Sequence, residues 1–260
     1  MRKNQLLLSV LTTTFSAVSA AQELVPDLDG MWSDPPATPE EMLCFAFCTD
    51  WGMARMNSLL DNPANDDRSY FELFTDVEAA ELEGYFRPRL TAAALETFPV
   101  DKADDPGFLY CEPWGFARQI FAPHQLEITQ FDNRVEMRYG EWDAHRTVYL
   151  DGREPPADLS PSPMGFSVGH YDGESLVVET MGVSKNITLW WSHHSDQLRT
   201  TERYTVSESR DRLFLTATME DPWGLNQPLV VKKVWSWAPD QKIAPYESCE
   251  RPTEYSRGVN

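Results

Sequence analysis

The second half of the chain repeats one pattern that restricts its fold. From about residue 108 onward, short segments rich in β-branched and aromatic residues follow one another, and many alternate polar with apolar positions. Alternation with a period of two is typical of a strand with one buried face. Turn-forming pairs such as Asp151–Gly152 and Asp172–Gly173 separate the segments. The segments are QLEITQF, RVEMRYGEW, HRTVYLDG, GFSVGHYDG, ESLVVETMGV, TTERYTVSES, RLFLTATMED and PLVVKKVWSW.

Eight short strands of this kind predict a mainly β fold. With few helices between them, consecutive strands are expected to pair as an antiparallel meander. Such a sheet removes its exposed edges by closing into a barrel or by folding into a sandwich. Because the connections are short and consecutive, we expect an up-and-down, lipocalin-like β-barrel over residues 108–250. A barrel of this size has room for side chains and a small ligand.

Residues 21–107 predict helices and loops that pack on the barrel. Thr38 and Glu41 have the spacing of a capping box, and apolar residues then recur at helical spacing until Pro63. The TDVE segment at residues 75–78 repeats the capping-box spacing, and LTAAALETF is a short third helix candidate. The alternative to simple packing is that these helices form a lid over a ligand cavity.

The first 20 residues have the features of a cleaved secretory signal. Arg2 and Lys3 precede a short apolar stretch, which ends in the small residues Ser19 and Ala20. We therefore expect a mature chain located in a periplasm or secreted from the cell. No later apolar run approaches the length of a membrane helix, so no membrane insertion is expected. Residues 251–260 are interpreted as a C-terminal tail.

The expected mature chain is strongly acidic. It holds 20 basic and 41 acidic residues, a net charge of 20 − 41 = −21, and residues 21–110 alone hold 19 acids and 5 bases. This charge disfavours nucleic acids and anionic lipids as partners. It leaves open a weaker interpretation, in which the acidic N-terminal segment contacts other subunits of an envelope complex.

Four cysteines remain in a chain predicted to be exported, and an even number favours disulfides. We expect Cys111 to pair with Cys249. Cys44 and Cys48 are then either a second pair or two buried thiols, because a bridge between residues four apart on one helix is awkward in direction. A thiolate metal or redox site is the remaining alternative.

Several quoted segments resemble a family of secreted bacterial β-rich proteins. Members carry a Cys-x-Pro-x-Gly-x-x-Arg segment, a YLDGR turn, an MGHSVGRWEGDTLVVDT hairpin, an HSD corner and an ER strand. The counterparts here are CEPWGFAR, VYLDGREPPADL, MGFSVGHYDGESLVVET, HSDQL and ERY, over roughly residues 108–235. The resemblance implies a compact secreted β domain and no particular reaction. The chain departs from the family pattern at Phe166, where a histidine is usual, and at His170, where an arginine is usual.

Strand alternation indicates the residues that could carry chemistry. Glu202 and Tyr204 share one face of their segment, and Arg146 lies on the opposite face of its segment from His145. If the face of Glu202 looks into the barrel, Glu202 could pair with Arg146 from another strand, and His194, which the family retains, would lie at the barrel mouth. These three residues are the predicted catalytic set for acid–base chemistry. The alternative is a structural ion pair between strands, which a protein can keep without any chemistry.

The ligand is expected to lie against aromatic and polar side chains near this set. Trp235 and Trp237 share a face, and an aromatic-lined mouth around His194 would suit a partly apolar molecule. The predicted substrate-binding residues are Tyr204, Trp191, Tyr149, His145, Phe166 and His170.

Other chemistries find less support in the sequence. Ser195 follows His194 directly, and adjacent residues of an extended segment point to opposite faces, so a serine triad is not expected. No histidine pair has the helical spacing of a zinc site, and no nucleotide, haem or flavin motif occurs, so we expect no metal and no cofactor.

Two functions follow from these observations. The first is a secreted, cofactor-independent acid–base enzyme of the lyase, isomerase or hydrolase type, acting on a small, partly apolar organic molecule inside the barrel. The second is a non-enzymatic small-molecule binding or carrier protein of the same shape.

Overall fold

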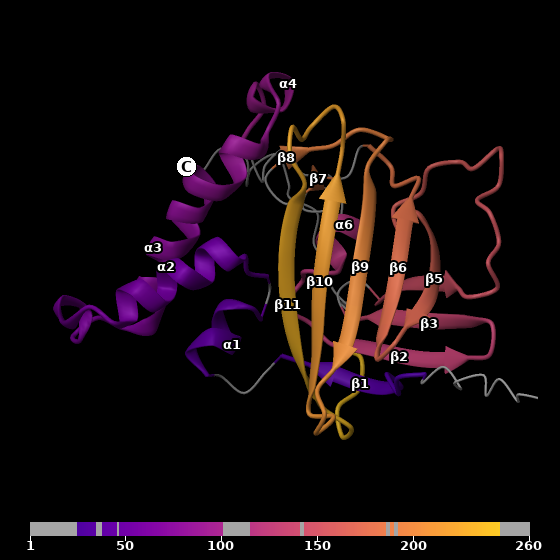
Figure 1. The fold of residues 1–260 in the computed structure, drawn as a ribbon, viewed down its shortest axis with the longest axis horizontal. Helices are drawn as coiled ribbons and strands as arrows, with labels where there is room; N and C mark the ends of the chain where they lie inside the picture. Colours follow the sequence, from indigo (N-terminus) through magenta and orange to yellow (C-terminus); the bar gives the residue numbers. More distant parts are fainter. Residues whose placement is uncertain are drawn as a thin grey trace, which may run out of the picture.

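Nine strands of the described chain close into a β-barrel (Figure 1). The computed structural model describes residues 25–34, 38–45, 47–100, 115–140, 143–185, 188–189 and 192–244. Around the barrel the strands follow the order β1, β11, β10, β9, β6, β5, β4, β3, β2. The predicted mainly β, largely antiparallel barrel is therefore confirmed. The predicted signal at residues 1–20 and the tail at residues 251–260 lie outside the described residues.

Eight of the barrel strands come from the predicted alternating region, and all but one neighbouring pair among them are antiparallel. The exception is β4 with β5, where Val148 lies beside Ser167 in a parallel register. Parallel neighbours require a connection that returns to the starting end, and here the proline-containing segment from residue 150 to 165 does so. The strands are β2 Leu126–Phe131, β3 Arg134–Tyr139, β4 Ala144–Tyr149, β5 Phe166–Asp172, β6 Ser175–Met181, β9 Arg199–Val206, β10 Arg212–Glu220 and β11 Leu229–Trp237. Two short strands, β7 Thr188–Leu189 and β8 Ser192–His193, pair with each other in the part of the chain that connects β6 to β9.

The ninth strand corrects the predicted boundary of the barrel. Strand β1, Gly30–Ser33, belongs to the range that we expected to hold only helices and loops, yet it joins β2 to β11 and closes the barrel. Trp32 is fully buried, and its indole nitrogen donates to the Leu28 carbonyl at 2.9 Å. A strand of four residues is too short to show the alternation that identifies longer strands, so its burial against the barrel decides its conformation.

The N-terminal helices begin at side-chain caps. Helix α1, Pro39–Leu43, begins at the predicted capping box of Thr38 and Glu41. Ser69 and Glu72 form a second box at the start of α3, Tyr70–Glu81. The start predicted at Thr75 is wrong, because Thr75 lies inside α3 and its hydroxyl donates to a backbone carbonyl. The other helical elements are α2 Asp50–Leu60, η1 Pro63–Asn65, η2 Leu82–Phe86, η3 Arg87–Arg89, α4 Ala92–Leu95 and α6 Phe116–Gln119.

The first predicted helix is interrupted where Cys44 and Cys48 form a disulfide, with their Cα atoms 4.7 Å apart. The cysteines lie in a turn between α1 and α2, so the awkward direction of a bridge within one helix does not arise. This disulfide excludes the alternative that Cys44 and Cys48 are two buried thiols. The predicted Cys111–Cys249 bridge lies outside the described residues.

The turn between α1 and α2 covers an edge of the barrel. Strand β1 pairs with β11 only at Trp237 and Ser236, which leaves the rest of that edge of β11 without a neighbouring strand. There Cys48 exchanges two backbone hydrogen bonds with Lys232, at 2.7 and 2.8 Å. Farther along, the Tyr85 hydroxyl donates to the Val230 carbonyl at 2.7 Å. In Figure 1 the helices lie beside β11. No helix among the described residues is long and apolar enough to cross a membrane.

Candidate functional site

Arg146 and Glu202 meet inside the barrel, so the condition on which we expected this pair is met. Each lies on the inward face of its strand, β4 or β9. The guanidinium donates to both carboxylate oxygens, from Nη1 to Oε2 at 2.7 Å and from Nη2 to Oε1 at 2.8 Å. The side chains are 1% and 0% exposed. This bidentate geometry is the strongest form of an arginine–carboxylate pair.

Hydroxyl groups use most of the remaining hydrogen-bonding capacity of the guanidinium. Arg146 Nε donates to Ser167 Oγ at 2.9 Å, and Nη2 also donates to Thr180 Oγ1 at 2.7 Å. Phe116, from α6, packs against the guanidinium, with its ring centre 4.6 Å from Cζ. Polar groups around the pair therefore bind one another and leave little capacity for a ligand.

The hydrogen-bonding capacity of the Glu202 carboxylate is also used by its neighbours. Besides Arg146, Glu202 accepts from the Tyr204 hydroxyl at 2.8 Å and from the hydroxyls of Thr180 and Thr200 at 3.3 Å each. A carboxylate has about four lone-pair sites. Five donors therefore satisfy Glu202 completely.

Electrostatics determine the protonation of Arg146 and of two neighbouring tyrosines. Burial is the largest single effect on the pKa of Arg146 and lowers it, but the Glu202 carboxylate, Tyr139 and Tyr204 together raise it, and the pKa lies above its usual value. Burial, and then Glu202, raise the pKa of Tyr204 well above the ordinary value, and burial also raises the pKa of Tyr139. At neutral pH the arginine is charged and both phenols are neutral.

His194 lies apart from this pair. It belongs to the loop after β8, is buried, and its Nδ1 lies 2.7 Å from the Ser195 carbonyl oxygen. A carbonyl oxygen only accepts, so Nδ1 carries the proton and Nε2 presents a lone pair. That Nε2 is buried and has no hydrogen-bond partner among the residues that the structure describes. No described hydrogen bond joins His194 to Arg146 or Glu202.

The pKa of His194 is lowered from its usual value. Burial is the main cause, and it outweighs the Ser195 carbonyl and the Asp221 carboxylate, which act in the opposite direction. The imidazole is therefore neutral at pH 7, with one unpartnered nitrogen.

Asp221, in the loop after β10, holds the loop of His194 and was missed by sequence reasoning. Its carboxylate accepts from the Ser195 hydroxyl at 2.5 Å and from the Ser195 amide at 2.8 Å. The hydroxyl of Ser195 thus bonds to Asp221 rather than to His194. The only sequence signal was the Asp221–Pro222 turn, which marks a loop and not its partner.

The remaining predicted binding residues lie on the outside of the barrel or beyond the described residues. Tyr149 stacks on Phe166, with ring centres 5.5 Å apart. His145 is exposed, with Nε2 3.4 Å from an Asp143 oxygen, and His170 is exposed on β5. Of the predicted set only Tyr204 touches the interior pair. Trp191 lies outside the described residues.

The aromatic mouth expected around His194 is not formed by Trp235 and Trp237. Trp235 faces Leu213 near the start of β10, whereas His194 lies next to the loop that follows the end of β10. Trp237 packs edge-on against Trp32, 5.1 Å between ring centres. The two tryptophans therefore belong to the opposite end of the barrel, because antiparallel pairing reverses the direction of β11 relative to β10.

A buried cation, Lys233, was also missed. Its ammonium lies inside the barrel, donates to the Ala122 carbonyl, and lies 4.6 Å from the ring centre of Trp235. The VVKKVW segment contained the signal, since alternation places one of its two lysines on the inward face.

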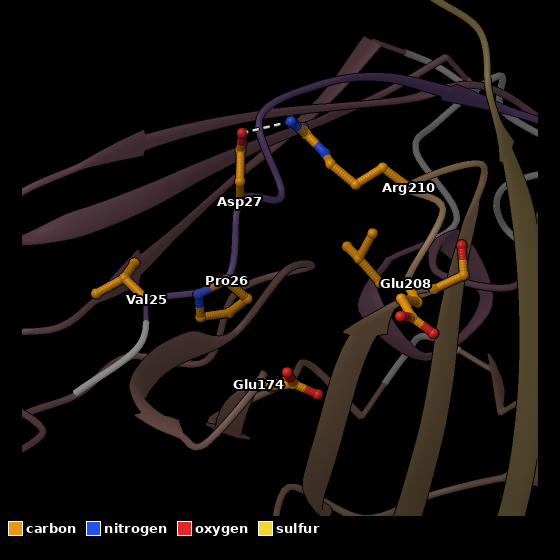
Figure 2. Close-up of a pocket in the computed structure, with 8 residues that line it drawn as sticks. Val25, Pro26, Asp27, Glu174, Glu208 and Arg210 are labelled. Carbon is orange, nitrogen blue, oxygen red and sulfur yellow. Dashed lines mark hydrogen bonds and ion pairs between the residues drawn. The ribbon is translucent and has the colours of Figure 1, made fainter. Parts of the chain in front are cut away.

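Hollows lined by described residues open on the surface. One lies between residues 25–27 and two turns, where Arg210 pairs with Asp27 at 2.5 Å and Glu174 and Glu208 lie nearby (Figure 2). Two more adjoin each other on the outer faces of β5, β6 and β9. None of these three includes Arg146, Glu202 or His194.

No three histidine, cysteine or acidic side chains within the described parts of the chain are grouped so as to hold a metal ion. No protein-family model matches the chain, and no curated protein matches it.

Proposed function

We propose that this chain is a periplasmic or secreted protein that binds a small, partly apolar organic molecule without transforming it. The observation that carries the proposal is the closed network around Arg146 and Glu202. A barrel whose interior arginine and glutamate satisfy one another acts as a rigid scaffold, and the ligand is then held at its surface.

The same network argues against acid–base chemistry by these two residues. To accept a proton from a substrate, Glu202 would have to lose donors that it now binds, and Arg146 would be left as a buried charge. Breaking one side of a buried pair typically costs about 3–5 kcal/mol. In addition, a general base must lie within hydrogen-bond reach of its substrate, and Glu202 is 0% exposed.

One observation favours the second candidate, an acid–base enzyme. His194 is neutral, and its Nε2 lone pair is unpartnered. Such a nitrogen is a chemically suitable general base if a substrate reaches it. In that case His194 acts without Arg146 and Glu202, because no described contact joins them.

The experiment that separates the candidates begins with native mass spectrometry of the protein purified from the culture medium or periplasm. A small molecule that co-purifies is identified and returned in excess to protein freed of ligand. We expect stoichiometric rebinding and an unchanged ligand mass after long incubation. Catalytic conversion by the wild type that His194→Ala abolishes would contradict the binding proposal and establish the enzyme.

The proposed compartment has a separate test. Mature protein recovered outside the cytoplasm should begin near Ala21 when its N-terminus is sequenced. Intact protein beginning at Met1 would contradict export by a cleaved signal.

A further inference from the structure

A two-part groove runs across the outer faces of β5, β6 and β9. Its halves have volumes of about 490 Å³ and about 730 Å³, and both are lined by Met181 and Arg199. The segment from residue 150 to 165 forms the opposite wall, and in Figure 1 it bows outward beyond these strands. Each half lies in the size range of small-molecule sites.

Arg199 differs from the other arginines on the described strands. Each of the others pairs with a carboxylate, while Arg199 has only a contact from Nη1 to the Met181 sulfur at 3.9 Å. A sulfur is a weak acceptor, so the guanidinium keeps its capacity for a bidentate partner. The paired arginines are Arg134, Arg138, Arg146, Arg203 and Arg212.

An arginine on a strand without a carboxylate partner is unexpected in so acidic a chain, although Arg55 in α2 and Arg89 in η3 also lack one among the described residues. The formal net charge is −19, and acidic side chains lie on both sides of Arg199 in the groove. None of the described carboxylates comes within ion-pair distance of it, as they do for Arg203 on the same strand. Arg199 is thus placed to meet an anion that comes from outside the chain.

The rest of the groove limits what that anion can be. The larger half has apolar walls from Leu159, Pro161 and Pro222, which suit an apolar body. Asp196 and Glu220 line the same half, so a second negative charge on the ligand would be repelled. The smaller half has His170 with Glu179, and Arg153 there already pairs with Asp151.

We propose that this groove binds a monocarboxylate with an apolar body, with the carboxylate on Arg199 and the body in the larger half. The proposal rests on the binding function proposed above and names its site and ligand class. Carboxylate–guanidinium pairs are bidentate and directional, so they orient the ligand. Met181, shared by both halves, then contacts the atoms next to the carboxylate.

The test uses phenylbutyrate as the probe, phenylbutanol as its neutral counterpart and phenylsuccinate as a dianion. Binding to the mature protein is measured by calorimetry and by methyl NMR of methionine-labelled protein, with the Met181 signal assigned from Met181→Leu. We expect phenylbutyrate to bind and to shift the Met181 methyl signal. Both other probes should bind about tenfold more weakly or worse.

Arg199→Gln and Arg203→Gln form a matched pair, because both arginines lie on the outer face of β9 and only Arg199 lines the groove. Arg199→Gln should weaken phenylbutyrate binding by about tenfold or more, while Arg203→Gln binds like the wild type. Unchanged melting temperatures show that both variants fold.

Three results would overturn the proposal: no binding of phenylbutyrate, equal binding of phenylbutanol, or equal binding by Arg199→Gln. The proposed binding function is tested separately. If a co-purified ligand still binds to Arg199→Gln, the groove is not its site, but the protein is still a binding protein. If the wild type converts that ligand to product, the binding function is contradicted, while the dependence of probe binding on Arg199 is unaffected.

Discussion

Arg146 and Glu202 show how one pair of side chains can occupy the interior of a barrel. Both are charged and fully buried, which is costly unless every donor and acceptor finds a partner. Here hydroxyls from two further strands and from β9 itself supply those partners: Ser167 from β5, Thr180 from β6, and Thr200 with Tyr204 from β9. The pair thus links strands on different sides of the barrel.

Removing one member of this pair should be far more harmful than removing both. Arg146→Met leaves Glu202 buried and unpaired, and should lower the free energy of unfolding by about 3–5 kcal/mol. The double variant Arg146→Met with Glu202→Leu should recover most of that loss, because neither charge remains. Urea unfolding at pH 7 measures both.

The exposed pair of Arg203 and Asp172 is the control, since Arg203→Met should cost less than about 1 kcal/mol. If the single and double interior variants lose the same free energy of unfolding, packing rather than an unpaired charge determines the loss.

Glu81 is a second buried acid, on α3. Its carboxylate accepts from the Thr49 hydroxyl at the start of α2, and a Cβ on Gly52 would lie 2.4 Å from Oε1. Burial is the main cause that raises the pKa of Glu81 to about 7. The Thr49 hydroxyl and the amides of Thr49 and Gly52 act in the opposite direction, and Glu78 adds to the rise.

A raised pKa makes stability depend on pH with a definite sign. Between pH 4.5 and about 7 the folded chain holds a proton on Glu81 that the unfolded chain has released. The contribution of Glu81 to the free energy of unfolding is therefore fully present below pH 4.5. It is lost as the pH rises through about 7, by up to about 3 kcal/mol. Glu81→Gln should flatten this slope in urea unfolding from pH 5 to pH 8, while exposed Glu96→Gln should keep it.

At the scale of elements, the turn between α1 and α2, which the Cys44–Cys48 disulfide closes, covers an edge of β11. An uncovered strand edge is a template for pairing with other chains. Cys48 bonds to Lys232, and the Cys44 carbonyl accepts from the Val234 amide at 3.2 Å, so the cross-linked turn takes the place of a neighbouring strand. The capping box at Thr38 could be predicted because its residues are close together in the sequence. The contact between the turn and β11 could not, because it joins residues far apart in the sequence.

Replacing Cys44 and Cys48 by serine should loosen this cover. The loop is short, so the expected loss in stability is about 2 kcal/mol. Amide hydrogen exchange at Lys232 and Val234 should become faster, while amides of β9 remain protected. Reduction of the wild type should reproduce the effect. Unchanged exchange at both amides would show that the turn covers the edge without the bridge.

At the scale of the molecule, closure of the barrel depends on a strand far from the others in sequence. Strand β1 crosses between β2 and β11, and Gly30 adopts a φ of +122° where it pairs with Ile128. A Cβ at Gly30 would lie 2.2 Å from the Trp237 ring. Only glycine adopts this conformation readily and also fits the space.

Gly30→Ala should therefore weaken closure. Backbone strain of this kind costs about 1–3 kcal/mol, and displacement of Trp237 adds to it. The melting temperature should fall, and hydrogen exchange should increase at amides of β2 and at the end of β11. Gly152→Ala tests the contribution of backbone strain alone, since its φ is +69° and no atom lies within 4 Å of its added Cβ.

The sequence by itself determined which side chains share a face of a strand. Alternation placed Glu202 with Tyr204, and Arg146 opposite His145, because the two-residue period of a strand is a local property of its backbone. Turn pairs and one capping box were readable for the same reason.

Only the tertiary structure decided which of these residues meet, and which do not. The pairing of Arg146 with Glu202, the separation of His194, the role of Asp221, the parallel β4–β5 pair and the closing strand β1 all depend on contacts between distant parts of the chain. Such contacts result from the packing of the whole barrel, where many small energies add up, and no single segment encodes that sum.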